Sequence, residues 1–190
     1  MDVVYNHTCE SVRKDRPYAG ADSTIWPYYR RTKDKISRLY DTTGCGNTLD
    51  FTNTHVTTFA VDSLRYWAKR IGIDGFRFDL AATLARLDGE FTRYHPFLYA
   101  LRSDMLLGNL KMIMEPWDCG PNGWRTGEFG IPFAEWNDRF RDCTRKFWLT
   151  DVDRMRGGEY GEMTMQEMAT RLCGSSDLFA TDPAAVRPRP

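Results

Sequence analysis

Short apolar runs that each end in polar or charged side chains are the feature that most constrains how this chain folds. Residues able to do chemistry follow these runs: residues 3–5 lead to Asn6 and His7, residues 71–78 lead to Asp79, and residues 112–114 lead to Glu115. Between the runs, apolar residues recur at helical spacing, most clearly over residues 55–71, which Gly72 ends. Strands that alternate with helices are typical of a parallel α/β sheet, whose strands share one carboxyl-terminal edge.

The pattern predicts strands near residues 3–5, 73–78, 111–114 and 133–136. It predicts helices over residues 55–71, from Pro96 to residue 106, over residues 137–149 with Phe140, Phe147 and Trp148 toward a core, and from a capping box at residues 164–167 to Gly174.

Asp79 follows a strand that carries Arg77 two residues earlier. Side chains alternate between the two faces of a strand, so Arg77 and Asp79 are expected on the same face. A guanidinium beside a carboxylate lowers the pKa of the carboxyl group and keeps it ionised at neutral pH. An ionised, positioned aspartate is suited to be a covalent nucleophile, and a purely structural arginine–aspartate pair is the alternative.

Glu115 ends a second strand, because Pro116 cannot donate a backbone hydrogen bond. The apolar face of Trp117 is expected to raise the pKa of Glu115, so that this carboxyl group can hold a proton to donate. One ionised and one protonated carboxyl group are what retaining glycoside hydrolysis requires. A solvated strand-end acid is the alternative for Glu115. His7 is expected to donate a hydrogen bond to a sugar hydroxyl, although a lone histidine at a strand end is more often structural.

The segments 2–7, 75–79 and 115–118 resemble, in order and context, the first three signature regions of the α-amylase family of glycoside hydrolases. The segments 44–49, 133–142 and 172–179 resemble the isoamylase and glycogen-debranching branch of that family. The resemblance implies a (β/α)8 TIM barrel, of which residues 1–179 are the central part, from the third to about the sixth strand. A complete barrel takes about 250 residues, so we expect this chain of 190 residues to be incomplete at both ends, with residues 180–190 a disordered or truncated end.

The resemblance also implies roles for individual residues. Asp79 matches the nucleophile, Glu115 the general acid/base, Arg77 the arginine that orients the nucleophile, and His7 a histidine that binds the sugar where cleavage occurs. Asp2 and Asn6 match positions that support this geometry. Further residues lie where this branch builds its glucan-binding cleft: Trp117, Asp118, Trp136 and Asn137.

Two departures from the family are visible. The fourth signature region, which carries a His-Asp pair, is absent from these residues, and Met114 stands where a small residue is usual and is expected to crowd the floor of the site. A piece of a barrel leaves sheet edges uncovered, so we expect the isolated chain to aggregate or to fold incompletely.

Composition excludes several kinds of partner. Lys and Arg total 26, as do Asp and Glu, and a formal net charge of zero supplies no basic excess for nucleic acid or anionic membranes. No apolar run reaches the roughly 18 to 20 residues of a membrane span. The five cysteines lack metal-ligand or redox spacing, which favours reduced thiols in a cytoplasmic protein. The chemistry requires no cofactor, and no metal-ligand cluster is visible; a structural calcium ion and the oligomeric state stay open.

Two functions remain. The first is hydrolysis of α-1,6 branch linkages in glycogen or limit dextrin, with another α-glucan hydrolase acting on α-1,4 linkages as its rival. The second is a truncated, inactive remnant that at most binds glucan, and we expect these residues alone to be inactive.

Overall fold

A computed structural model of the chain describes residues 1–8, 26–34, 38–158 and 165–179. The expected end at residues 180–190, the side chain of Trp26, Cys9 and the capping-box residue Thr164 lie outside the described residues. The chain divides into two compact units, Met1–Glu135 and Trp136–Pro190. None of the helices in the described part has both the length and the apolar character needed to span a bilayer.

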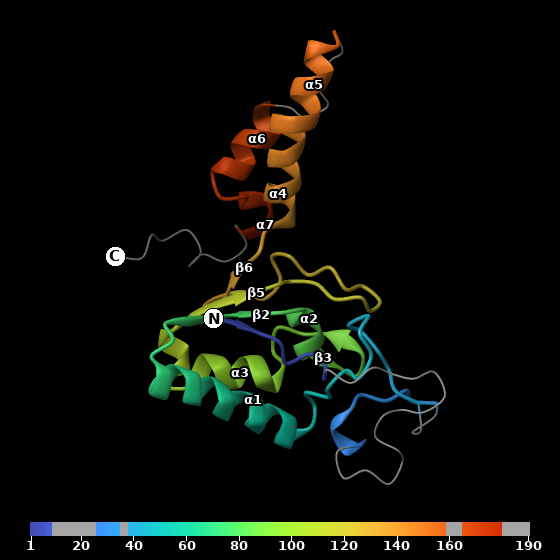
Figure 1. The fold of residues 1–190 in the computed structure, drawn as a ribbon, viewed down its shortest axis with the longest axis vertical. Helices are drawn as coiled ribbons and strands as arrows, with labels where there is room; N and C mark the ends of the chain where they lie inside the picture. The colour runs from blue at the N-terminus through green and yellow to red at the C-terminus, as the bar shows by residue number, and fades with distance from the viewer. Residues whose placement is uncertain (9–25, 35–37, 159–164, 180–190) are drawn as a thin grey trace. The chain divides into compact units, whose positions relative to one another are not determined.

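The first unit is built on four parallel strands, which confirms the predicted strands and their parallel pairing. They are β1 (Asp2–Val3), β2 (Gly75–Phe78), β5 (Lys111–Met114) and β6 (Ala134–Glu135), paired in that order. Among the described residues the sheet is open, with β1 and β6 at its edges (Figure 1). The fold is therefore of the α/β class expected for part of a TIM barrel, and barrel closure stays a prediction.

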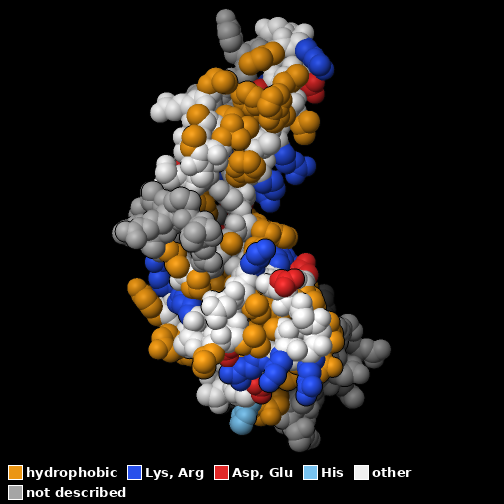
Figure 2. Space-filling view, turned by 90° about the vertical axis from the view of Figure 1, so that its left-hand side faces the viewer, with side chains coloured by type: hydrophobic (Ala, Val, Ile, Leu, Met, Phe, Trp, Pro, Cys, Tyr) orange, Lys and Arg blue, Asp and Glu red, His pale blue; other side chains and the backbone are white. Residues whose placement is uncertain are grey.

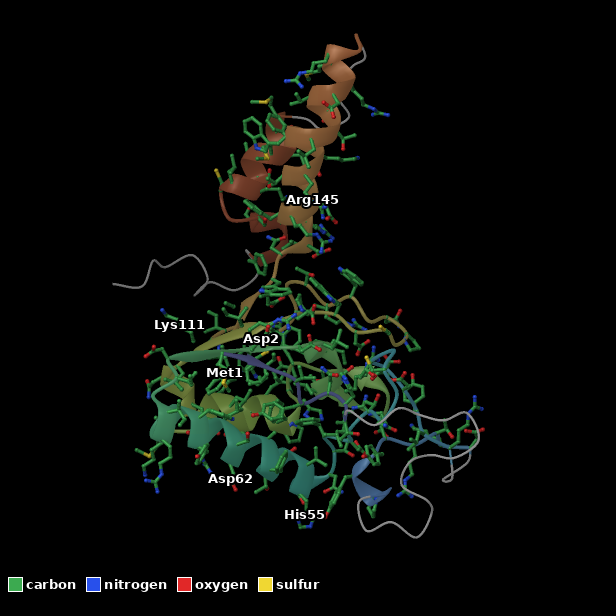
Figure 3. The ribbon with its side chains drawn as sticks, in the orientation of Figure 1. Met1, Asp2, His55, Asp62, Lys111 and Arg145 are labelled. Atoms are coloured by element: carbon green, nitrogen blue, oxygen red, sulfur yellow. The ribbon has the colours of Figure 1, made fainter. Side chains whose placement is uncertain are left out.

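Two helical segments cover one face of this sheet (Figure 1). They are α1 (Thr54–Tyr66), which continues as the π-helical turn η2 (Trp67–Ile71), and α3 (Pro96–Ser103). Helix α3 begins at Pro96, as the sequence predicts, and α1 is capped by Asn53, whose side chain accepts the backbone N–H of His55. On α1, His55 and Asp62 lie on the side of the helix away from the sheet (Figure 3).

The apolar core lies between the sheet and these helices. From the strands it takes Val3, Phe76, Phe78, Met112 and Met114, and from the helices Val56, Leu64, Leu98 and Leu101. Because side chains alternate along a strand, Met114 points into this core while Glu115 points to the opposite face. The expectation that Met114 crowds the floor of the site is therefore wrong.

Several short elements of the first unit carry no clear sequence signal. They are η1 (Trp26–Tyr28), α2 (Ala81–Leu84), η3 (Leu107–Asn109) and the antiparallel pair β3 (Arg86–Leu87) and β4 (Glu90–Phe91). Each is four residues or shorter, too short for a periodic pattern to appear.

The second unit is helical over its described residues. It contains α4 (Asp138–Arg145), the π-helical turn η4 (Lys146–Thr150), α5 (Asp151–Arg156), α6 (Met165–Leu172) and α7 (Ser176–Phe179). The prediction that Phe140 and Trp148 face a core is wrong, because both are exposed and α4 instead buries Cys143 against Met168 of α6. Figure 2 shows the hydrophobic side chains that this unit leaves on its surface.

Candidate active site

Arg77 stands at the centre of the candidate site and contacts three carboxylates. Its Nη1 lies 2.8 Å from Oδ1 of Asp79 and 3.0 Å from Oδ1 of Asp2, and its Nη2 lies 3.0 Å from Oε1 of Glu115. The strand register explains the grouping, because Asp2 pairs with Arg77, and Phe78 pairs with Met114 one residue before Asp79 and Glu115. The structure thus confirms that Arg77 and Asp79 share a face, and it adds the contact between Arg77 and Glu115.

Asn6 holds the Asp79 carboxylate from the other side. Its Nδ2 donates to Oδ2 of Asp79 at 2.9 Å and to the Asp79 carbonyl oxygen at 2.8 Å. With Arg77 on Oδ1 and Asn6 on Oδ2, both carboxylate oxygens of Asp79 are engaged and the group is held in one orientation.

The orientation of Asn6 also determines the tautomer of His7. Since the amide nitrogen of Asn6 faces Asp79, its Oδ1 faces His7 and accepts a hydrogen bond from Nδ1 of that ring. Neutral His7 therefore carries its proton on Nδ1, and its Nε2 can only accept. A neutral His7 thus presents an acceptor at Nε2 where the sequence led us to expect a donor, and its contact with a sugar stays a prediction.

The loop that carries the glycine-rich motif at residues 44–49 supports the strand end at His7. His7 forms an isolated antiparallel bridge with Thr48, and the backbone N–H of Leu49 donates to the Asn6 carbonyl at 3.0 Å. Inside the loop, the Asp41 carboxylate accepts from Thr43, Gly46 and Thr48. The motif therefore supports the backbone of Asn6 and His7.

Glu115 is placed to hold a proton. Burial raises the pKa of its carboxyl group, and the nearby negative charge of Asp79 raises it further, against the lowering effects of the Leu80 N–H and of Arg77. The pKa of Glu115 thus moves in the direction that the sequence predicts, with burial as the largest cause.

The backbone of Leu80 contributes to the site, although no sequence pattern indicates it. Leu80 has φ +42° and ψ +51°, a left-handed conformation that is unfavourable for a branched side chain. This conformation directs its N–H to Oε2 of Glu115 at 2.7 Å. The residue after Asp79 thus positions the Glu115 carboxyl group.

Asp118 lies in a buried ion pair with Arg86, and both side chains have 0% exposure. Nε and Nη2 of Arg86 lie 2.6 and 2.7 Å from the two carboxylate oxygens, which also accept from Thr83 and Gly120. A carboxylate with both oxygens occupied and no exposed surface cannot reach a sugar. The expectation that Asp118 binds glucan is therefore corrected: Asp118 and Arg86, whose partnership the sequence does not reveal, anchor the loop after Glu115.

Trp136 and Asn137 belong to the second unit. Asn137 caps α4 by accepting the N–H of Phe140 at 2.9 Å, and its Nδ2 donates to Oγ of Ser175 at 2.9 Å. Its amide is thus already engaged at both ends, and Trp136 is exposed. The part of Trp136 and Asn137 in glucan binding stays a prediction.

Trp117 stacks on Trp124, with ring centroids 5.0 Å apart and planes inclined by 15°. The described residues contain no group of three or more His, Cys, Asp or Glu side chains arranged to hold a metal ion. The site presents three carboxylates on one guanidinium with a histidine beside them, and the loop after Glu115 carries the aromatic pair.

The chain is similar to known glycogen-debranching proteins. The chain is 41% identical over 179 residues to the glycogen debranching enzyme of Erwinia tasmaniensis, a match that covers 94% of this chain and 25% of the relative. It is 39% identical over 181 residues to the "glycogen operon protein GlgX homolog" of Mycobacterium tuberculosis, covering 94% of this chain and 23% of the relative. The chain thus spans about a quarter of the length of these relatives, and no family model matches it.

Solved structures of pullulanases are also similar to this chain. A pullulanase from Anoxybacillus sp. LM18-11 in complex with maltotetraose has a TM-score of 0.61 and 26% identity, covering 94% of this chain and 25% of that one. Pullulanase from Bacillus acidopullulyticus has a TM-score of 0.55 and 27% identity, covering 75% of this chain and 17% of that one. The resemblance to glycogen debranching enzymes that the motifs indicate is confirmed.

Proposed function

We propose that this chain carries the two catalytic carboxyl groups of an α-glucan hydrolase that cleaves α-1,6 branch linkages with retention. The observation that supports this most is the placement of Asp79 and Glu115 on one arginine, with the pKa of Glu115 raised. Double displacement at a sugar carbon needs a carboxylate nucleophile and a neighbouring carboxyl group that can hold a proton, and the raised pKa of Glu115 suits the second task.

In the first step, a carboxylate oxygen of Asp79 attacks the anomeric carbon while the bond to the leaving oxygen breaks. The proton of Glu115 goes to that leaving oxygen, so a covalent glycosyl ester and a free sugar hydroxyl are formed. In the second step Glu115, now ionised, takes a proton from water, and the water oxygen displaces Asp79. Arg77 and Asn6 hold Asp79 for the attack, and His7 accepts a hydrogen bond from a hydroxyl of the bound sugar.

The preference for α-1,6 over α-1,4 linkages rests on the relatives, several of which are named glycogen debranching enzymes, and on the pullulanases among the structural neighbours. The proposed substrate is accordingly a branched α-glucan such as glycogen or limit dextrin.

The test uses a chimera in which this chain replaces the matched segment of the Erwinia enzyme, because these residues alone are expected to be inactive. The chimera is incubated with limit dextrin and, separately, with linear amylose, and reducing ends and product lengths are measured. Release of linear maltooligosaccharides from the branched glucan, little attack on amylose, and loss of both in Asp79→Asn are the expected results. A folded but inactive chimera would refute hydrolysis and leave the glucan-binding remnant as the alternative.

A further inference from the structure

Two cysteines that are far apart in the sequence lie on neighbouring loops beside the candidate site. Cys45 belongs to the loop that supports Asn6 and His7, and Cys119 belongs to the loop that follows Glu115. Both thiols are free and exposed. The sequence hides this arrangement, because no short spacing such as C-x-x-C connects the two residues.

The sulfur of Cys119 lies against the backbone directly before Cys45. Its Sγ donates to the Thr43 carbonyl oxygen at 3.4 Å, and a Cβ on Gly44 would lie 3.4 Å from the same sulfur. The backbone N–H of Cys119 also donates to the Thr42 carbonyl oxygen at 2.8 Å. Cys45 follows Gly44, and the Cα atoms of consecutive residues are about 3.8 Å apart. The backbone of Cys45 therefore begins one residue beyond a group that the Cys119 sulfur contacts.

The electrostatic environment of Cys119 indicates the same proximity. Although the residue as a whole is exposed, its sulfur faces the other loop, and this partial burial raises the pKa of the thiol. The negative charges of Asp118 and Asp41 raise it further, and a thiolate at Cys45 has the same effect, so the two sulfur atoms lie within electrostatic reach of each other. A disulfide carries no charge, so the groups that oppose a thiolate at Cys119 do not oppose the bonded form.

We propose that Cys45 and Cys119 form a reversible disulfide that joins the two loops. A disulfide needs Cα atoms about 4.4 to 6.8 Å apart, and the glycines on both sides of Cys45 allow the backbone adjustment that brings it to Cys119. The oxidant is a low-molecular-weight disulfide such as glutathione disulfide.

The reaction is a thiol–disulfide exchange in two steps. One protein thiolate attacks a sulfur atom of glutathione disulfide and releases the first glutathione, and the other protein thiolate then attacks the mixed disulfide and releases the second. Two electrons pass from the cysteine pair to one glutathione disulfide, and the two cysteine protons end on the two released glutathione molecules.

The bond would connect two supports of the candidate site. One loop holds the backbone of Asn6 and His7, and the other begins after Glu115, with Asp118 paired to Arg86. Exposed disulfides are typically labile and regulatory, so the redox state would set how firmly the two loops are held together. The inference goes beyond the proposed function and does not depend on it, because the linkage can be measured without hydrolysis.

The experiment uses the chimera described above, so that the loops are tested within a full-length chain. The chimera is equilibrated with glutathione disulfide, the remaining thiols are blocked with N-ethylmaleimide, and linked peptides are identified by mass spectrometry after proteolysis. Cys45→Ser and Cys119→Ser are compared with Cys173→Ser, a matched control because Cys173 is also free and exposed but lies in the second unit. Circular dichroism checks that each variant is folded.

We expect a peptide pair joined through Cys45 and Cys119 as the major linked product, which excess dithiothreitol removes. Cys45→Ser and Cys119→Ser should each lose this product and keep glutathione on the remaining cysteine, because the thiol that displaces it is missing. Cys173→Ser should form the linkage to the same extent as the parent.

Absence of the Cys45–Cys119 linkage from the folded chimera would overturn the proposal, whether the two cysteines carry separate glutathione groups, pair with other cysteines or stay unmodified. Failure of the proposed function is distinct, since it shows as absent hydrolysis in a chimera that is kept reduced.

Discussion

His95 is a buried histidine whose charge state links the stability of the first unit to pH. The side chain has 0% exposure, and its Nδ1 accepts the N–H of Phe97 at 3.2 Å, which caps α3. Burial, assisted by the positive charge of Arg30, lowers the pKa of His95 to about 4. A proton on Nδ1 would both bury a charge and remove the cap, so the folded state keeps the ring neutral.

The sign of the effect follows from the two pKa values. In the unfolded chain His95 has its ordinary pKa of about 6.5, so between pH 6.5 and pH 4 the unfolded state binds a proton that the folded state does not. The free energy of unfolding therefore falls as the pH falls through this window. The difference between the two pKa values, about 2.5, corresponds to about 3 kcal/mol of the free energy of unfolding. Most of this contribution is lost by pH 4.5.

The assay is urea unfolding at pH 7.5 and at pH 4.5, at low protein concentration, on the parent chain and on His95→Asn. Asparagine is a good N-cap and does not titrate, so this variant should keep the cap and lose the pH dependence that His95 causes. Carboxyl groups titrate in both chains, so the difference between the two pH dependences isolates His95. We expect the parent to lose about 2 to 3 kcal/mol more than the variant on acidification. Equal losses would refute the reasoning, as would an NMR titration of the three histidines in which His95 titrates near pH 6.5.

Further predictions concern the acid, the sheet and the loop. Glu115→Gln should lower the rate on branched glucan by about 10² to 10⁴ but spare an activated aryl glycoside, since only the natural leaving group needs a proton; equal losses on both substrates would argue against the acid role. Gly75→Ala should lower the free energy of unfolding by about 1 to 3 kcal/mol, because the new Cβ would lie 2.5 Å from the Lys111 carbonyl oxygen on the neighbouring strand. Gly157→Ala, whose Cβ meets nothing nearer than 3.4 Å, is the control in the same urea titration, and similar effects of both would contradict the clash. Asp118→Ala should cost about 3 to 5 kcal/mol by leaving the buried Arg86 unpaired, and an unchanged urea midpoint would show that the pair is dispensable. The open sheet edges at β1 and β6 predict aggregation of the purified chain, which a sharp cooperative thermal melt of a monomer would contradict.

Local patterns were sufficient to predict the sheet and the two carboxyl groups. Apolar runs that end at Asp79 and Glu115 predict both the strands and the edge at which the acids meet, because strand alternation and parallel pairing leave few arrangements. Helix α1 was predictable for the same reason, as its apolar residues recur at helical spacing over more than three turns.

Contacts between distant segments were decided only by the tertiary structure. Arg77 also contacts Glu115, which follows the neighbouring strand. Asp118, expected to bind sugar, instead pairs with Arg86, 32 residues away in the sequence, and anchors its loop. The orientation of Asn6, fixed by Asp79 across 73 residues, sets the tautomer of His7. The sequence by itself therefore determined which groups reach the active edge of the sheet. Packing between distant segments decides the environment of each of these side chains. It decides whether a side chain faces solvent, is paired with an opposite charge, or only supports another residue, and no local pattern encodes this packing.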